Sequence, residues 1–168
     1  MFDFIARFFT KRLIAKNKKK ESVPYTNWDS VKSIAFIIDV HTTINKSKLD
    51  AFFAQLNKYF SVYLVETNKS EPTFSDWSCI TKKQKSIFGL PKKELFEKLK
   101  AKNYDVLVCV NPSDNTFTSN LCASIHAGLR CGSNDTFGEL DLIIASSNKE
   151  LIAVLEECVR YLKMIKKQ

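Results

Sequence analysis

The chain has 168 residues, of which 45 % are hydrophobic and 26 % are charged. This composition is typical of one globular domain that is large enough to form a core without disulfide or metal staples. Only four Gly and four Pro occur, which argues against collagen-like and low-complexity chains. The sequence also lacks a run of about 18 apolar residues, which argues against a membrane-spanning helix.

The formal net charge of +8 is concentrated at the beginning of the chain. Residues 1–20 hold seven cations and one carboxylate, so they carry +6, whereas the other 148 residues carry +2. Nucleic-acid-binding folds usually spread their cations over a face of the domain itself. The sequence instead predicts a basic amphipathic helix or arm over residues 1–22 and a nearly neutral α/β domain over residues 28–168.

The first predicted element is a helix over residues 2–18, because apolar residues recur there at steps of three and four. The apolar stripe consists of Phe2, Ile5, Phe9 and Leu13, widened by Phe4 and Phe8. The aromatic residues precede the cations and no A-x-A-like cleavage site follows, which is the reverse of a secretory signal. We therefore expect a cytoplasmic protein, peripheral at the inner membrane surface if the helix binds lipid.

This helix is the strongest functional candidate in the sequence. Phenylalanines beside cations suit an interfacial helix on anionic lipid, a helix in a partner protein's groove, or a contact with ribosomal RNA. The expected contact residues are Phe4, Arg7, Phe8, Lys11, Arg12, Lys18, Lys19 and Lys20. In the alternative, Phe4, Ile5 and Phe8 pack on this protein's own sheet and only the lysine run meets water.

Predicted strands and helices alternate along the rest of the chain. Strands are expected at 32–40, 61–66, 105–110, 129–132 and 140–145, with a further short one within 74–80. Helices are expected at 45–59, 92–100, 115–127 and 149–165. This alternation predicts an α/β fold, a Rossmann-like three-layer sandwich around a mostly parallel sheet. It does not predict the order of the strands.

Polar residues follow several of the expected strands, at the edge where open parallel sheets bind ligands. The candidate ligand-binding residues are Asp39, His41, Thr42, Asn111, Ser113, Gly132 and Ser133. Asp39 and His41 have the chemistry of an acid–base pair, but such residues also form turns and helix caps. We therefore predict binding at this edge and no catalytic residue.

Motifs for several common activities are missing. The sequence contains no G-x-G-x-x-G, no G-K-[ST], no G-x-S-x-G and no H-E-x-x-H, which argues against dinucleotide, P-loop, α/β-hydrolase and zincin sites. No cysteines stand at C-x-x-C spacing, so neither a metal nor a cofactor is predicted. All five cysteines are interpreted as reduced, small hydrophobic residues: Cys79, Cys109, Cys122, Cys131 and Cys158.

Two further features have a functional and a structural interpretation. Lys82 and Lys83 lie in a basic segment near Trp77 and Phe88, so they are candidates for a phosphate or RNA contact, or else belong to a solvated loop. His126 is expected at the end of a helix, where its charge would favour the helix dipole.

Ordered motifs along nearly the whole chain carry a resemblance. They are FxxRFFTKR (4–12), VKSIAF (31–36), DWSCITKK (76–83), FGLP (88–91), YDVLV (104–108), GLRCG (128–132) and ELDLII (139–144). By these motifs the chain resembles a family of short α/β proteins of Bacteroidota-type bacteria, known only as a domain of unknown function. The resemblance implies an intracellular α/β domain and no assigned activity.

A weaker likeness is to the N-terminal half of heptosyltransferase-type glycosyltransferases. In these proteins a strand that begins Tyr-Asp leads through a helix to a short strand that ends Arg-x-Gly, here Arg130 and Gly132. The likeness implies one Rossmann-like half, a degenerate form that could bind a nucleotide or sugar phosphate, although such transferases bind their sugar nucleotide mainly on the other half. The glycine-rich first turn and the second half are missing, so transferase catalysis is not expected.

The sequence thus favours an interaction module that is not an enzyme and is recruited to a membrane surface, ribosome or protein complex through residues 1–20. The first alternative is a protein that binds a nucleotide or sugar phosphate at the strand ends. The second is an RNA- or ribosome-associated protein, whose affinity would fall steeply with salt.

Overall fold

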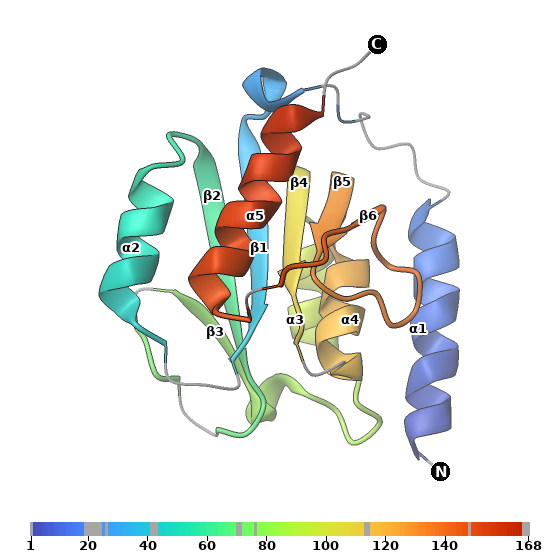
Figure 1. Ribbon diagram of the computed structural model, residues 1–168. Coiled ribbons are helices and arrows are strands. Elements are labelled where there is room, and N and C mark those ends of the chain that lie inside the picture. Colours follow the sequence, from blue (N-terminus) through green and yellow to red (C-terminus); the bar gives the residue numbers. More distant parts are fainter. Residues whose placement is uncertain are drawn as a thin grey trace.

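The computed structural model describes residues 2–18, 25, 27–40, 44–69, 72–75, 77–112, 115–147 and 149–165. Its strands form one six-stranded sheet with helices on both faces (Figure 1). Every ladder between named strands is parallel. The predicted α/β sandwich is therefore confirmed, and the sheet is wholly rather than mostly parallel.

The strands are β1 (Ser33–Asp39), β2 (Tyr59–Glu66), β3 (Ser78–Thr81), β4 (Asn103–Val110), β5 (His126–Gly132) and β6 (Leu142–Ile143). The helices are α1 (Phe2–Lys18), α2 (Lys46–Ala54), α3 (Lys93–Lys100), α4 (Thr116–Ser124) and α5 (Leu151–Met164), with short 3-10 turns η1 (Trp28–Ser30) and η2 (Lys82–Gln84). The order across the sheet is β3-β2-β1-β4-β5-β6. The chain thus builds outward from β1 to one edge and returns through α3 to start the other half at β4. The carboxyl ends of β1 and β4 therefore form the topological switch point.

β1 is the centre of the structure and is apolar on both of its faces. Ile34, Phe36 and Ile38 belong to the core that α2 and α5 cover. Ala35 and Ile37 belong to a second core, which includes residues of α3 and α4. Alternate residues of a strand point to opposite faces of its sheet. The uninterrupted apolar run of β1 therefore requires a helical layer on each side.

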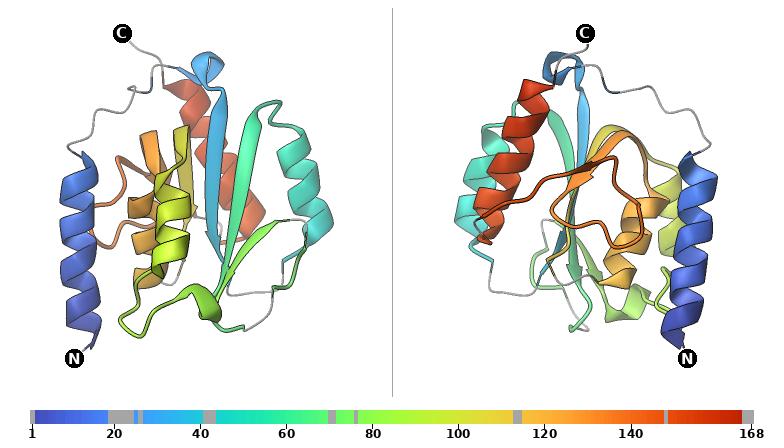
Figure 2. Two further views of the ribbon diagram at one scale, coloured as in Figure 1. Left: turned by 180° about the vertical axis from the view of Figure 1, so that it is seen from behind. Right: turned by 45° about the vertical axis from the view of Figure 1, so that its right-hand side comes forward.

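Helix α1 forms an additional layer outside α4, and its bounds agree with the predicted 2–18. α1 packs along α4, and Figure 2 shows it on the side of α4 away from the sheet. Ala6, Thr10 and Ile14 are its buried residues and lie four residues apart. The Thr10 hydroxyl lies 2.7 Å from the Ala6 carbonyl oxygen and 2.9 Å from Oδ1 of Asn120 in α4. A small and polar stripe therefore joins the two helices.

Two predicted helices end early because strand pairing takes over their last residues. α2 ends at Ala54 instead of 59, and after a turn in which Asn57 has φ 48° the chain enters β2 at Tyr59, opposite Ser33. α4 ends at Ser124, and His126 pairs with Asn103 as the first residue of β5. The expectation that His126 ends a helix and serves its dipole is therefore wrong.

The interpretation of all five cysteines as reduced is also wrong. Cys109 of β4 and Cys122 of α4 form a disulfide, with their Cα atoms 6.6 Å apart. Both are fully buried, and their 13-residue separation matches no motif. On the other side of the sheet, Cys131 and Cys158 are free thiols. A hydrogen bond with Cys158 and burial raise the pKa of Cys131 well above its usual value, so this thiol is unreactive.

Gly132 brings β5 into close contact with β4, and we expect Gly132→Ala to destabilise the fold. A Cβ atom at this position would overlap the Cys109 carbonyl oxygen and approach Leu140 Cδ1 to 3.0 Å. Overpacking of this kind costs about 1–3 kcal/mol in the free energy of unfolding, measurable by urea denaturation. Gly138→Ala is the control, because it introduces only the strain of φ +77° with no atom within 4 Å. Equal losses in the two variants would contradict the steric explanation.

Thr10 joins α1 to α4, and we expect Thr10→Val to loosen this contact. The substitution keeps the shape of the side chain but leaves Asn120 Oδ1 without the hydroxyl that lies 2.9 Å away. A buried acceptor without a partner costs about 1–3 kcal/mol. Thr10→Ser keeps the hydroxyl and should retain most of the stability. Hydrogen exchange of the α1 amides measures the effect, and faster exchange in both variants alike would contradict this role.

Candidate functional site

A cleft of about 520 Å³ opens beyond the carboxyl ends of β1 and β4. Its lining residues are Asp39, Val40, Ile44, Val110, Pro112, Ser133, Asn134, Ala145, Ser146, Lys149, Leu151 and Val154. They come from the ends of β1 and β4, from the segments that follow β1, β4, β5 and β6, and from the beginning of α5. The cleft thus lies at the switch point, where open α/β sheets bind their ligands.

The polar groups of the cleft differ in charge and burial. Asp39 ends β1 with 4 % of its surface exposed, and its Oδ2 accepts a hydrogen bond of 3.1 Å from Thr118 Oγ1 of α4. The Ser133 hydroxyl is buried and has no hydrogen-bond partner among the described residues. Lys149 is exposed at the rim, directly before α5. The cleft therefore offers a held carboxylate, an unsatisfied hydroxyl and an ammonium group.

Only some of the predicted ligand-binding residues line the cleft. Asp39 and Ser133 line the cleft. The Asn111 side chain instead supports the start of α4, since Oδ1 accepts from Asn115 N (2.9 Å) and Nδ2 donates to Asn115 O (3.1 Å) and Ser119 Oγ (3.3 Å). Gly132 serves the close approach of β5 to β4. The remaining three lie outside the described residues: His41, Thr42 and Ser113. Lys149 was not among the candidates, because only its position before a helix singles it out.

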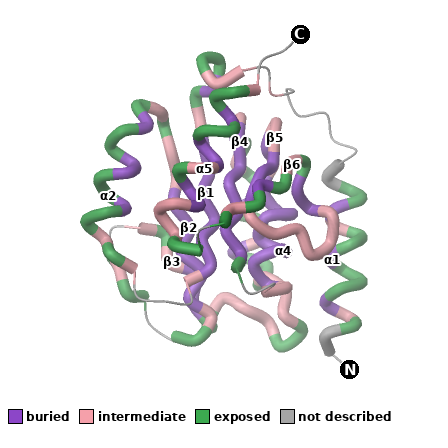
Figure 3. Tube along the Cα trace, viewed as in Figure 1, coloured by how far each residue is buried: buried purple, intermediate pink, exposed green. Residues whose placement is uncertain are grey.

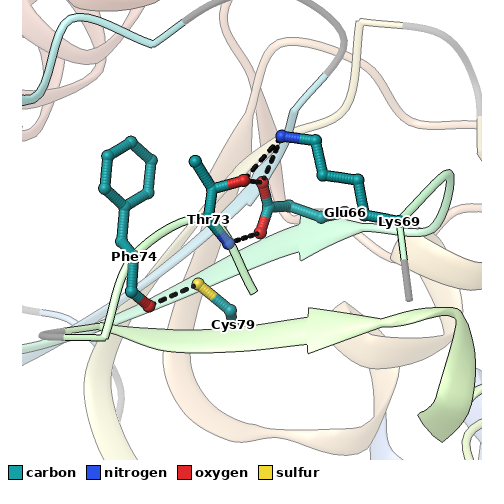
Figure 4. A network of polar contacts seen from close by, with 5 residues as sticks. All are labelled: Glu66, Lys69, Thr73, Phe74 and Cys79. Carbon is teal, nitrogen blue, oxygen red and sulfur yellow. Dashed lines mark hydrogen bonds and ion pairs between the residues drawn. The ribbon is translucent and has the colours of Figure 1, made fainter. Parts of the chain in front are cut away.

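Glu66 ends β2 and is held by its own loop (Figure 4). Its carboxylate accepts from the backbone N of Thr73 (2.9 Å) and from the Thr73 hydroxyl, and it pairs with Lys69 Nζ at 3.2 Å. Burial alone would raise the pKa of Glu66, but these hydrogen bonds outweigh it and lower the pKa below its usual value. Dinucleotide-binding folds use an acidic residue about 20 residues after the glycine-rich turn to hold a ribose hydroxyl. Here that carboxylate is committed to the loop, in agreement with the missing glycine motif.

The outer face of α1 is apolar at its centre and basic at its sides. Phe4 and Phe8 are 76 % and 56 % exposed. The surrounding cations Arg7, Lys11, Arg12 and Lys16 are exposed as well. The alternative in which Phe4 and Phe8 pack on the sheet is therefore wrong, because Ala6, Thr10 and Ile14 occupy the inner face instead. Of the other expected contacts, Lys18 is the last residue of α1, and Lys19 and Lys20 lie outside the described residues.

A second apolar segment adjoins α1. The loop after η2 contains Ile87, 82 % exposed, and Phe88, 39 % exposed. Next to them, a Cβ atom at Gly89 would lie 3.7 Å from Ala6 Cβ of α1. Lys82 and Lys83 are exposed in η2, at the start of the same segment. The segment that begins at the basic pair Lys82 and Lys83 thus contacts the basic helix α1, although the two are far apart in the chain.

A family model described as a family of unknown function (DUF6913) matches residues 4–165. Neither a curated protein nor a solved structure matches the chain. Over the described residues, no helix is long and apolar enough to cross a membrane. The same part of the chain holds no group of three His, Cys, Asp or Glu residues that could bind a metal ion.

Glu66 should make the stability of the fold depend on pH. Because its pKa is lower in the folded chain, the carboxylate stabilises the fold above its unfolded pKa of about 4.5, and this contribution is lost as the pH falls through the folded value. The Glu66→Gln substitution should therefore lower the free energy of unfolding by about 1–2 kcal/mol at pH 7 and by less below pH 4.5. The exposed Glu97→Gln serves as control in urea titrations at each pH. A loss independent of pH would refute the assignment.

Proposed function

Because this chain belongs to a family of unknown function, DUF6913, we propose its role from the geometry: it is an interaction module that docks on an anionic lipid bilayer through the outer face of α1. The observation that carries the proposal is the exposure of Phe4 and Phe8 on a helix whose other face is already occupied. Two large aromatic side chains exposed one helical turn apart form an apolar patch that a partner can cover.

Cations lie beside these two rings and beyond them along the helix. At 100° per residue, Arg7 and Lys11 project to one side of the Phe4–Phe8 row, and Arg12 continues that row one turn after Phe8. The Arg7 guanidinium also lies 5.8 Å from the centre of the Phe137 ring. An interfacial helix has this pattern, with rings that enter the acyl boundary and cations at the level of the headgroup phosphates. Each Lys or Arg near an anionic surface contributes about 1 kcal/mol, and each buried Phe about 1.5–3 kcal/mol. Neither group is sufficient alone, so both are needed for stable docking.

The folded state of α1 favours this role. An isolated helix of this length is marginal in water, so interfacial segments usually lose binding free energy when they order at the membrane. Here α1 is held on α4 through Ala6, Thr10 and Ile14, so the docking face is formed in advance. Figure 3 shows exposed and buried residues alternating along α1, as expected for a helix with one face on the protein and one in solvent.

A bilayer fits this surface better than RNA does. An RNA backbone is held chiefly by cations that contact phosphates, whereas here phenylalanines occupy the centre of the face and the cations its margins. Ile87 and Phe88 are exposed in the loop that contacts α1 at Ala6, and they add apolar surface without charge. The exposed pair Lys82 and Lys83 lies at the start of the same segment.

We expect the full chain to co-sediment with vesicles of phosphatidylcholine and phosphatidylglycerol and not with phosphatidylcholine alone. Replacing both Phe4 and Phe8 by Asp removes two inserted rings and should weaken binding roughly 100-fold. The matched control replaces Tyr59 and Ile143 by Asp, because these residues are 68 % and 58 % exposed elsewhere on the surface. Binding unchanged by the first pair of substitutions, or weakened equally by both pairs, would refute the proposal.

The charge contribution is tested in the same assay. Lys11→Ala with Arg12→Ala should weaken binding to anionic vesicles roughly 30-fold, whereas Lys92→Ala with Lys93→Ala, two exposed residues at the start of α3, should not. Ribosomal RNA serves as the competing partner. If RNA binds the chain and anionic vesicles do not, the surface is a nucleic-acid contact and the bilayer proposal is wrong.

A further inference from the structure

The switch-point cleft is lined by residues outside α1. Its volume of about 520 Å³ lies within the range of small-molecule sites, which is 300–1,000 Å³. Apolar side chains form much of its lining, with Val40 and Ile44 after β1 and with Leu151 and Val154 at the start of α5. Walls of aliphatic side chains suit a flat ring better than they suit a sugar alone, because a sugar would leave its hydroxyls facing hydrocarbon.

The carboxylate of the cleft suits the hydroxyls of a ribose. Asp39 lines the cleft at the end of β1 and is oriented by Thr118, whose hydroxyl donates to its Oδ2 at 3.1 Å. A carboxylate accepts up to about four hydrogen bonds, so the bond from Thr118 is compatible with further donors from a ligand. A vicinal diol presents two donors at the spacing of two carboxylate oxygens. Asp39 therefore favours a ligand with neighbouring hydroxyl groups.

A buried hydroxyl directly after β5, beyond β4 in the sheet, has no hydrogen-bond partner among the described residues. Ser133 lines the cleft after β5, and its Oγ has no hydrogen-bond partner among the described residues. Buried polar groups in native proteins are nearly always paired, by protein, water or ligand. Asn134, the next residue, also lines the cleft and has its Nδ2 3.5 Å from the Asn111 carbonyl oxygen. Asn134 therefore provides a hydrogen bond for the polar edge of a bound ring, whereas the Ser133 hydroxyl is buried behind the surface of the cleft.

The opposite rim of the cleft is positive. Lys149 is exposed there, and α5 begins two residues later. The side chain of its N-cap residue Glu150 does not cap the helix and pairs with Lys48 Nζ at 3.2 Å. The first backbone N–H groups of a helix have no intrahelical partner, and the helix dipole favours an anion at this end. α5 has 14 residues, which is long enough for a full dipole. Lys149 and this helix end therefore favour a phosphate group on the ligand.

From these groups together we propose that the cleft binds a ribonucleoside monophosphate, with its base between the aliphatic walls, its ribose diol on Asp39 and its phosphate at Lys149. Two other features of the chain argue against a dinucleotide as the ligand. Glu66, the acidic residue at the end of the neighbouring strand, is committed to Thr73 and Lys69. The first turn also lacks the glycines that let a backbone approach a pyrophosphate.

The test is isothermal titration of the full chain with the four ribonucleoside 5′-monophosphates. The comparison ligands are their nucleosides, their 2′-deoxy forms, ribose 5-phosphate and inorganic phosphate. We expect at least one monophosphate to bind, its 2′-deoxy form to bind roughly 10-fold more weakly because Asp39 loses a donor, and the base-free compounds to bind more weakly still. If no monophosphate binds more tightly than inorganic phosphate, the proposal is overturned. Equal binding of ribose 5-phosphate would show a sugar-phosphate site and overturn the assignment of the base.

Two variants locate the ligand. Lys149→Ala should weaken binding of the monophosphate roughly 10-fold and leave the nucleoside unaffected, because only the phosphate loses a contact. Lys93→Ala is the matched control, an exposed lysine at the start of α3 that does not line the cleft. Leu151→Trp should fill the cleft and abolish binding, and a cooperative thermal unfolding transition like that of the natural chain is required to show that this variant folds. Equal effects of the two lysine variants, or full binding by Leu151→Trp, would place the ligand elsewhere.

This test is independent of the docking proposal. The variant with Phe4 and Phe8 replaced by Asp changes only the outer face of α1 and should bind the nucleotide as the natural chain does. Failure of vesicle binding therefore leaves the cleft proposal standing, and failure of nucleotide binding leaves the docking proposal standing.

Discussion

The burial of β1 on both faces is the constraint on which the rest of the structure depends. Its uninterrupted apolar run can leave water only if helices cover each side of the sheet. The two halves of the chain then extend in opposite directions from β1 and β4, and their diverging connections leave the cleft open at the shared carboxyl edge. Asp39 lies in that cleft for the same reason, since it is the first polar residue after the apolar run ends.

α4 is the second determinant, because it lies between the sheet and α1. All of its residues from Phe117 to Ser124 are buried, although half of them are polar. Their polar groups are paired: Thr118 with Asp39, Ser119 with Asn111, and Asn120 with Thr10. A helix with polar groups on its outer side needs a partner that also carries polar groups. Thr10 of α1 is such a polar partner, and because this side of α1 faces α4, Phe4 and Phe8 lie on its opposite face.

Much of the fold could be predicted from the sequence, because strong local patterns coincide with the real elements. The apolar run of β1 and the bounds of α1 are examples. The ends of α2 and α4 could not be predicted, since pairing with β1 and β4 draws Tyr59 and His126 into strands. The residues by which α1 contacts α4 could not be predicted for another reason: hydrophobic periodicity selects Phe2, Ile5, Phe9 and Leu13, whereas the buried residues of α1 are Ala6, Thr10 and Ile14. The sequence predicted Asp39 and Ser133 at the carboxyl ends of their strands, and both line the cleft there, but no local pattern marks Lys149 or pairs Cys109 with Cys122.

The position of α4 has one more consequence. Thr118 and Asn120, two residues apart on this helix, bond to the carboxylate of the cleft and to the helix that carries the outer phenylalanines. A rigid element that contacts two binding surfaces transmits its displacement to both. Such thermodynamic coupling is reciprocal: the factor by which an occupied outer face changes affinity in the cleft equals the factor by which an occupied cleft changes affinity at the outer face. α4 is the element that joins the two proposed sites, so any coupling between docking and ligand binding would pass through it.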